Sequence, residues 1–242
     1  MSPADRDHET LARAELAAWR EKIVREPTVL AAAARVLQLR INALIPEKIH
    51  AAVTVAIEQM TRGILAGSKF VTDGPLPTGS LRDREAQVRK AIKSYRNVAT
   101  AEGGVTGAGG FLMAAADFPA LVAIKIKLLF EISALYGHNA ADWRERLYIL
   151  SIFQLAFSSA DHRKAVFLAM TGGGQPERPE DFDWRRFQQE YRDYIDLAKL
   201  AQMLPIVGAP VGAFVNFRLL EQLGETAMNA YRLRWFEEPP AG

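Results

Sequence analysis

Apolar residues recur at helical spacing through most of the chain, and no segment alternates apolar and polar residues for long enough to predict a strand. In residues 6–26 the apolar side chains lie among alternating charges, which is typical of a surface helix. Pro27 ends this helix, because proline disfavours helical geometry at the residue before it. Thr28 and Pro46 then start two further helices, which extend to about residues 44 and 66.

Residues 67–79 and 172–181 are rich in glycine and proline and are predicted to be loops. After the first loop, Ser80 with Asp83 resembles a capping box and starts a helix over residues 81–99. Its apolar side chains fall on one face and its basic side chains on another. The spacing therefore predicts an amphipathic basic helix.

The second half of the chain predicts four more helices. The first covers residues 118–136, and the second starts at Asn139 or a neighbour. The third begins near Phe187. The last ends near residue 236, after interruptions at Pro205 and Pro210. Residues 147–160 contain no charged side chain. A helix that is apolar nearly all round is either buried in the protein or in contact with lipid.

These patterns predict an all-α protein with a single helical domain over residues 1–242, built from about eight to ten helices around tightly packed glycine-rich central helices. Residues 1–14 and 237–242 are expected to be peripheral or disordered. The hydrophobic fraction of 49% supports a sizeable core, and the absence of cysteine excludes disulfides and thiolate chemistry. Because the N-terminus lacks the apolar segment of a signal peptide, the expected location is the cytoplasm.

The most distinctive stretch is residues 102–137, in which a cluster of glycines leads into an Asp-Phe-Pro sequence and then a long apolar segment. A second apolar block follows near the C-terminus. Together they resemble the motifs of the EcsC family, and the resemblance covers roughly residues 15–235. The matching residues are Gly103, Gly104, Gly107, Gly110, Asp117, Pro119, Tyr136 and Gly137 in the first block and Pro205, Gly208, Gly212 and Asn216 in the second.

The resemblance implies a bacterial protein with a connection to membrane transport, since the family is named after the third member of an ABC-transporter operon linked to secretion. The glycine spacing has its own physical meaning. Gly103 and Gly107, like Gly208 and Gly212, are four residues apart, so each pair leaves a bare strip on a helix where another backbone can come close. We therefore expect segments 103–137 and 201–217 to pack against each other. The alternative is that both segments enter a bilayer surface.

Spanning a membrane is the less favoured arrangement for both segments. Two prolines break residues 201–217, and three charged side chains interrupt residues 103–130 at a cost of roughly 2.5–3.5 kcal/mol each at a bilayer centre. Shallow or reversible association with the inner face of the membrane remains open. The basic helix could contribute to it, because anionic lipid attracts cations near its surface. The candidate lipid contacts are Arg82, Arg89, Lys93 and Arg96.

A charged helix face is also consistent with simple solvation. Nucleic acid is not an expected partner, because the chain lacks a recognised DNA- or RNA-binding pattern. The glycine cluster lacks the sequence of a phosphate-binding loop, and the histidines are not at metal-ligand spacing, so neither cofactor nor metal is expected. Ser158 and His162 are one helical turn apart, but no G-x-S-x-G sequence accompanies them.

Asp117 precedes Phe118-Pro119 and is interpreted as a helix cap, with a polar ligand contact as the alternative. We therefore favour a non-catalytic accessory protein at a membrane or beside a membrane-protein complex. The alternative is a soluble enzyme or small-ligand-binding protein with a pocket near Asp117 and the glycine cluster. The sequence does not specify an oligomeric state.

Overall fold

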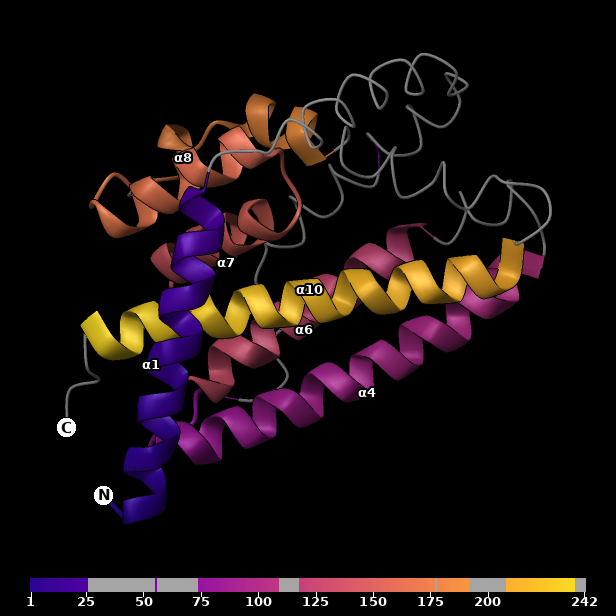
Figure 1. The fold of residues 1–242 in the computed structure, drawn as a ribbon. Coiled ribbons are helices and arrows are strands. Elements are labelled where there is room, and N and C mark those ends of the chain that lie inside the picture. The colour runs from indigo at the N-terminus through magenta and orange to yellow at the C-terminus, as the bar shows by residue number, and fades with distance from the viewer. Residues whose placement is uncertain (26–54, 56–73, 109–117, 177, 192–207, 238–242) are drawn as a thin grey trace.

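The computed structural model describes residues 1–25, 55, 74–108, 118–176, 178–191 and 208–237 (Figure 1). No strand occurs in these residues, which confirms the all-α prediction. A helical segment also begins at Trp184 and is described as far as Tyr191. The elements are α1 Pro3–Val24, α4 Leu81–Ala108, α6 Phe118–Leu135, α7 Trp143–Ala156, α8 Ala160–Thr171, the short 3-10 helix η1 Pro179–Asp181 and α10 Gly208–Glu237.

The two long helices, α4 and α10, lie side by side and antiparallel, with α6 beside them (Figure 1). They approach closely at Gly224 of α10, where an added Cβ would lie 2.6 Å from side-chain atoms of Ile92 on α4. Real Cβ atoms do not approach other atoms so closely, so only glycine fits this crossing. Close helix packing at a glycine is therefore present, at a residue that the sequence motifs did not indicate.

The antiparallel register brings the glycine-bearing ends of α4 and α10 to the same end of the helix pair (Figure 1). At 100° per residue, Gly103 and Gly107 lie about 20° and about 60° around α4 from Ile92, the residue that faces Gly224 of α10. A bare strip at these two glycines stays a prediction. Gly208 and Gly212 lie about 160° and about 120° around α10 from Gly224. The packing of residues 201–217 against residues 103–137 likewise stays a prediction. Three motif residues lie outside the described residues: Gly110, Asp117 and Pro205. Within the helices predicted over residues 28–66 only Val55 is described, and it is helical.

The charge-free segment forms the buried helix α7. Most of its side chains have less than 5% of their surface exposed, and they form the centre of the main hydrophobic core. Its start differs from the prediction, because the side chain of Asp142 rather than Asn139 accepts the capping hydrogen bond, from the backbone of Arg144. The segment also contains a break, since α7 ends at Ala156 and Ser159 caps the next helix.

Helix α1 crosses α4 and α10 (Figure 1). Its start is a capping box between Ser2 and Asp5, which satisfies two of the backbone N–H groups that a helix start leaves open. The helix predicted over residues 6–26 is present as α1, and although most side chains of residues 1–14 are exposed, Ala12 is buried. The N-terminal helix is therefore part of the packed fold.

At the other end of the chain, Pro210 lies in the first turn of α10 as it is described, where a proline is tolerated, and does not interrupt that helix. Among the helices that the structure describes, none is both long enough and apolar enough to cross a membrane.

Candidate functional site

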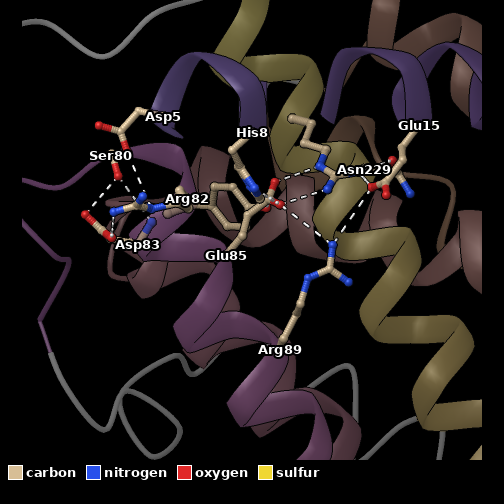
Figure 2. Close-up of polar contacts among 11 residues, drawn as sticks. Asp5, His8, Glu15, Ser80, Arg82, Asp83, Glu85, Arg89 and Asn229 are labelled. Atoms are coloured by element: carbon tan, nitrogen blue, oxygen red, sulfur yellow. Dashed lines mark hydrogen bonds and ion pairs between the residues drawn. The ribbon is translucent and has the colours of Figure 1, made fainter. Parts of the chain in front are cut away.

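A fully buried carboxylate, Glu85 on α4, lies where α1, α4 and α10 meet (Figure 2). Arg232 on α10 donates two hydrogen bonds to it, from Nε to Oε1 at 2.6 Å and from Nη2 to Oε2 at 2.8 Å. The hydroxyl of Tyr136 donates to Oε1 at 3.2 Å, and Nε2 of His8 lies 3.0 Å from Oε2. Protein donors thus surround both carboxylate oxygens.

The guanidinium of Arg232 is as fully engaged as the carboxylate. Its Nη1 contacts a carboxylate oxygen of Glu15 on α1 at 2.7 Å and donates to Oδ1 of Asn229 at 3.3 Å. Burial acts to raise the pKa of Glu85, but the hydrogen bonds and charge of Arg232, with a smaller contribution from His8, outweigh it and hold the pKa below its usual value. Glu85 is therefore ionised in the folded protein at neutral pH.

A second buried carboxylate, Glu145 on α7, has a similar set of partners. Its Oε1 accepts hydrogen bonds from Ser133 at 2.7 Å and from the hydroxyl of Tyr231, and its Oε2 accepts one from Arg234. Nδ1 of His138 lies 4.0 Å from the same Oε2. Each cluster thus combines a glutamate with an arginine of α10, a tyrosine and a histidine.

Aromatic rings join the two clusters. The ring of Tyr136, from the Glu85 cluster, stacks on the ring of Tyr231, from the Glu145 cluster, with centroids 5.0 Å apart and planes 17° apart. Burial and the adjacent carboxylates raise the pKa of both tyrosines well above the usual value, so both hydroxyls stay protonated and donate. The stacked rings of Tyr136 and Tyr231 therefore join the two polar clusters inside the core.

Gly137, which follows the cluster tyrosine, makes the turn that ends α6. Its φ is +90°, and a Cβ there would lie 3.0 Å from Nη1 of Arg84 and 3.1 Å from the carbonyl oxygen of Leu76. The buried Arg84 side chain donates to the carbonyls of Leu76, Gly79 and Leu135. The Tyr-Gly motif thus has two structural functions, a hydrogen bond to Glu85 and a turn that makes room for Arg84.

The four predicted lipid contacts differ in their surroundings. Arg82 pairs with Asp5 and Asp83 at 3.5 Å, and Arg89 lies 3.9 Å from Glu15, and both side chains are about half exposed. Lys93 is exposed. Arg96 is mostly buried, because it donates to Glu221 at 3.1 Å and stacks over the ring of Phe217. Three of the four cations therefore have intramolecular acidic partners.

Ser158 and His162 do not form a nucleophile–base pair. The Ser158 hydroxyl donates to the backbone carbonyl of Gln154 at 2.6 Å, and Nε2 of His162 lies 2.7 Å from the side-chain oxygen of the same Gln154. An open cleft of about 330 Å³ lies nearby, lined by Asp183, Arg185, Arg186, Gln189 and Glu190. Within the described ranges, no group of three or more histidine or acidic side chains is arranged to hold a metal ion.

The sequence reasoning missed Glu85, Glu145, Arg232 and Arg234 as central residues. One signal was available for Glu85, because it lies four residues after Leu81 and seven before Ile92, on the apolar face of its helix. Glu145 falls in the first turn of α7, where an acidic residue is common for reasons of the helix dipole alone.

In its described residues the protein is all-helical, and its core contains two clusters in which buried glutamates accept hydrogen bonds from arginine and tyrosine side chains. The chain belongs to the EcsC protein family, whose model matches residues 10–236. It is 43% identical over 221 residues to Protein EcsC of Bacillus subtilis (strain 168), which covers 91% of this chain and 93% of the relative. It is also 30% identical over 147 residues to the Uncharacterized protein YdbA of the same organism, over 59% of this chain and 54% of that protein. No solved structure matches the chain.

Proposed function

We propose that this EcsC protein acts without catalysis as an accessory protein at an anionic membrane surface, beside a membrane-protein complex. The observation that carries the proposal is a basic stripe on α4, formed by Arg82, Arg89 and Lys93, which lie seven and four residues apart on a helix at the edge of the described fold (Figure 1). This spacing aligns the three side chains along one line of the helix surface. Anionic lipid contributes on the order of 1 kcal/mol for each such cation near the surface.

The buried clusters support a structural interpretation rather than a catalytic one. A catalytic carboxylate needs an open side from which a substrate proton or atom can reach it. Glu85 and Glu145 instead accept hydrogen bonds from tyrosine, arginine and, for Glu145, serine side chains on both oxygens. The family's link to an ABC-transporter operon adds a reason to place the partner at a membrane.

Co-sedimentation with lipid vesicles tests this proposal. We expect the purified chain to bind vesicles that contain phosphatidylserine, to ignore neutral phosphatidylcholine vesicles, and to be released at high salt, because exposed charges are screened. Salt-resistant binding would instead indicate insertion of the apolar segments. A chain that binds neither kind of vesicle at low salt would contradict the proposal.

A charge-reversal pair identifies the surface involved. Lys93 belongs to the basic stripe and Lys90 directly follows its residue Arg89. Both lysines are exposed on α4, so Lys90→Glu with Lys93→Glu should abolish binding to the anionic vesicles without unfolding the protein. The control is Lys22→Glu with Arg144→Glu, which reverses two exposed cations on α1 and α7. Equal loss of binding in both variants would show that net charge, not the α4 stripe, governs the interaction.

A further inference from the structure

The first half of α1 brings acidic side chains onto the basic stripe (Figure 2). A carboxylate oxygen of Asp5 lies 3.5 Å from Nε of Arg82, and one of Glu15 lies 3.9 Å from Nη2 of Arg89. The same Glu15 oxygen contacts Arg232 at 2.7 Å. Two of the three stripe residues therefore already have carboxylate partners from another helix.

The second half of α1 is attached differently. Leu16 and Ile23 are buried in a small apolar cluster with Phe167 of α8 and Leu233 of α10. The ring of Trp19 contacts the ring of Phe167 edge-on, with centroids 5.7 Å apart. These apolar contacts keep α1 in place whatever its first half contacts.

We propose that Asp5 and Glu15 are internal competitors of the membrane, covering Arg82 and Arg89 until an anionic lipid surface takes their place. This inference rests on the membrane role proposed above and describes how that role is regulated. The headgroup phosphates and carboxylates supply the same anionic oxygens that Asp5 and Glu15 now supply. Binding exchanges one set of ion pairs for another.

The geometry makes the exchange accessible. Both pairs are long, and the pair of Arg89 with Glu15 is exposed on both sides, so it contributes little to stability. In the other pair Arg82 is about half exposed, whereas the Asp5 side chain is 14% exposed. When Glu15 turns away, Arg232 keeps both hydrogen bonds to Glu85, so no buried charge is left without a partner. The exchange moves the Glu15 side chain away from Arg89 and separates Asp5 from Arg82, while Asp5 Oδ2 bonds to Ser2 in the capping box.

The test compares vesicle binding of the whole chain with that of Asp5→Asn combined with Glu15→Gln. Both substitutions keep side-chain size and remove one negative charge each. We expect the partition coefficient for vesicles that contain phosphatidylserine to rise on the order of tenfold at low salt, with no change for phosphatidylcholine vesicles. The difference should vanish at high salt. Far-ultraviolet circular dichroism during heating verifies that the variant is folded.

The matched control is Asp7→Asn with Glu21→Gln, which removes two exposed negative charges from the same helix away from the stripe. An equal rise in both variants would overturn the competition and leave only a net-charge effect. Binding of the unmodified chain with no rise in the Asp5 and Glu15 variant would overturn the competition alone. If neither protein sediments with anionic vesicles, the membrane role and the competition both fail.

Discussion

Arg232 of α10 donates two parallel hydrogen bonds to the buried carboxylate of Glu85 on α4, although 147 positions separate the two residues in the chain. A side-on pair of this kind fixes distance and orientation together, because the guanidinium fork matches the two carboxylate oxygens. It fixes how α4 and α10 align, and Tyr136 and His8 add α6 and α1 to the same point. The contacts around this pair therefore help to fix the relative positions of four helices.

Removing one partner of this pair should be costly. We expect Arg232→Met to lower the free energy of unfolding by about 3–5 kcal/mol, because Glu85 would be left as a buried charge without its main partner. Glu85→Gln with Arg232→Met should recover part of that loss, since no isolated charge remains. Urea unfolding followed by circular dichroism measures both. A double variant whose loss equals the sum of the losses of Glu85→Gln and Arg232→Met measured separately would contradict a direct energetic coupling.

Acid should destabilise the protein through Glu85. The folded pKa of this carboxyl lies below its ordinary value of 4.5, so the folded state favours the ionised form. Its contribution is complete above pH 4.5 and is lost as pH falls through the folded pKa, because the unfolded chain then binds more protons. The urea concentration at the unfolding midpoint, measured from pH 7 to pH 3, should decrease as the pH drops below 4.5. The decrease should be smaller in Glu85→Gln.

His162 adds a second window at higher pH. Burial lowers the pKa of His162 below its ordinary value of 6.5; Arg186 acts in the same direction, while Glu190 and Asp183 oppose both. The unfolded chain therefore takes up a proton below pH 6.5 before the folded protein does, and stability falls as pH decreases from there. In His162→Gln the urea midpoint should fall less steeply between pH 7 and pH 5.5 than in the unmodified chain. An unchanged slope would show that other groups control this range.

The crossing of α4 and α10 predicts the effect of a single methyl group. Gly224→Ala would place a Cβ 2.6 Å from Ile92, and we expect a loss of about 1–3 kcal/mol from overpacking. Ile92→Ala should relieve part of that loss when combined with it. The control is Gly74→Ala, where an added Cβ meets nothing within 4 Å. Thermal melting that gives Gly224→Ala the stability of the control would refute the close crossing.

The helical class and the burial of α7 followed from periodicity and from the lack of charge in residues 147–160. The ends of the helices were predicted less accurately from the sequence. Asp142 caps α7, and a break at residues 157–159 separates α7 from α8. Local pattern does not contain the antiparallel pairing of α4 with α10. For that reason Glu85 could be recognised as a charge on an apolar face, while its partner Arg232 could not.

The family motif likewise indicated Tyr136 and Gly137 without their reasons, which are contacts to Glu85 and Arg84 from a helix about fifty residues earlier. The basic residues of α4 were found, but their pairing with Asp5 and Glu15 of α1 was not predicted. Sequence periodicity does not predict which charged residues, far apart in the chain, pair with each other in the fold.

Gly137 allows a backbone effect and a contact effect to be separated. Gly137→Ala combines a positive φ with a Cβ 3.0 Å from Arg84, whereas Gly173→Ala has a positive φ of +73° and nothing within 4 Å. Strain at the positive φ should cost each variant about 1–2 kcal/mol. Gly137→Ala should lose more, because its methyl group displaces a guanidinium that donates to Leu76 and Leu135. Urea unfolding of both variants measures the difference. If the two losses are equal, Arg84 accommodates the methyl group, and the turn requires glycine for its backbone conformation alone.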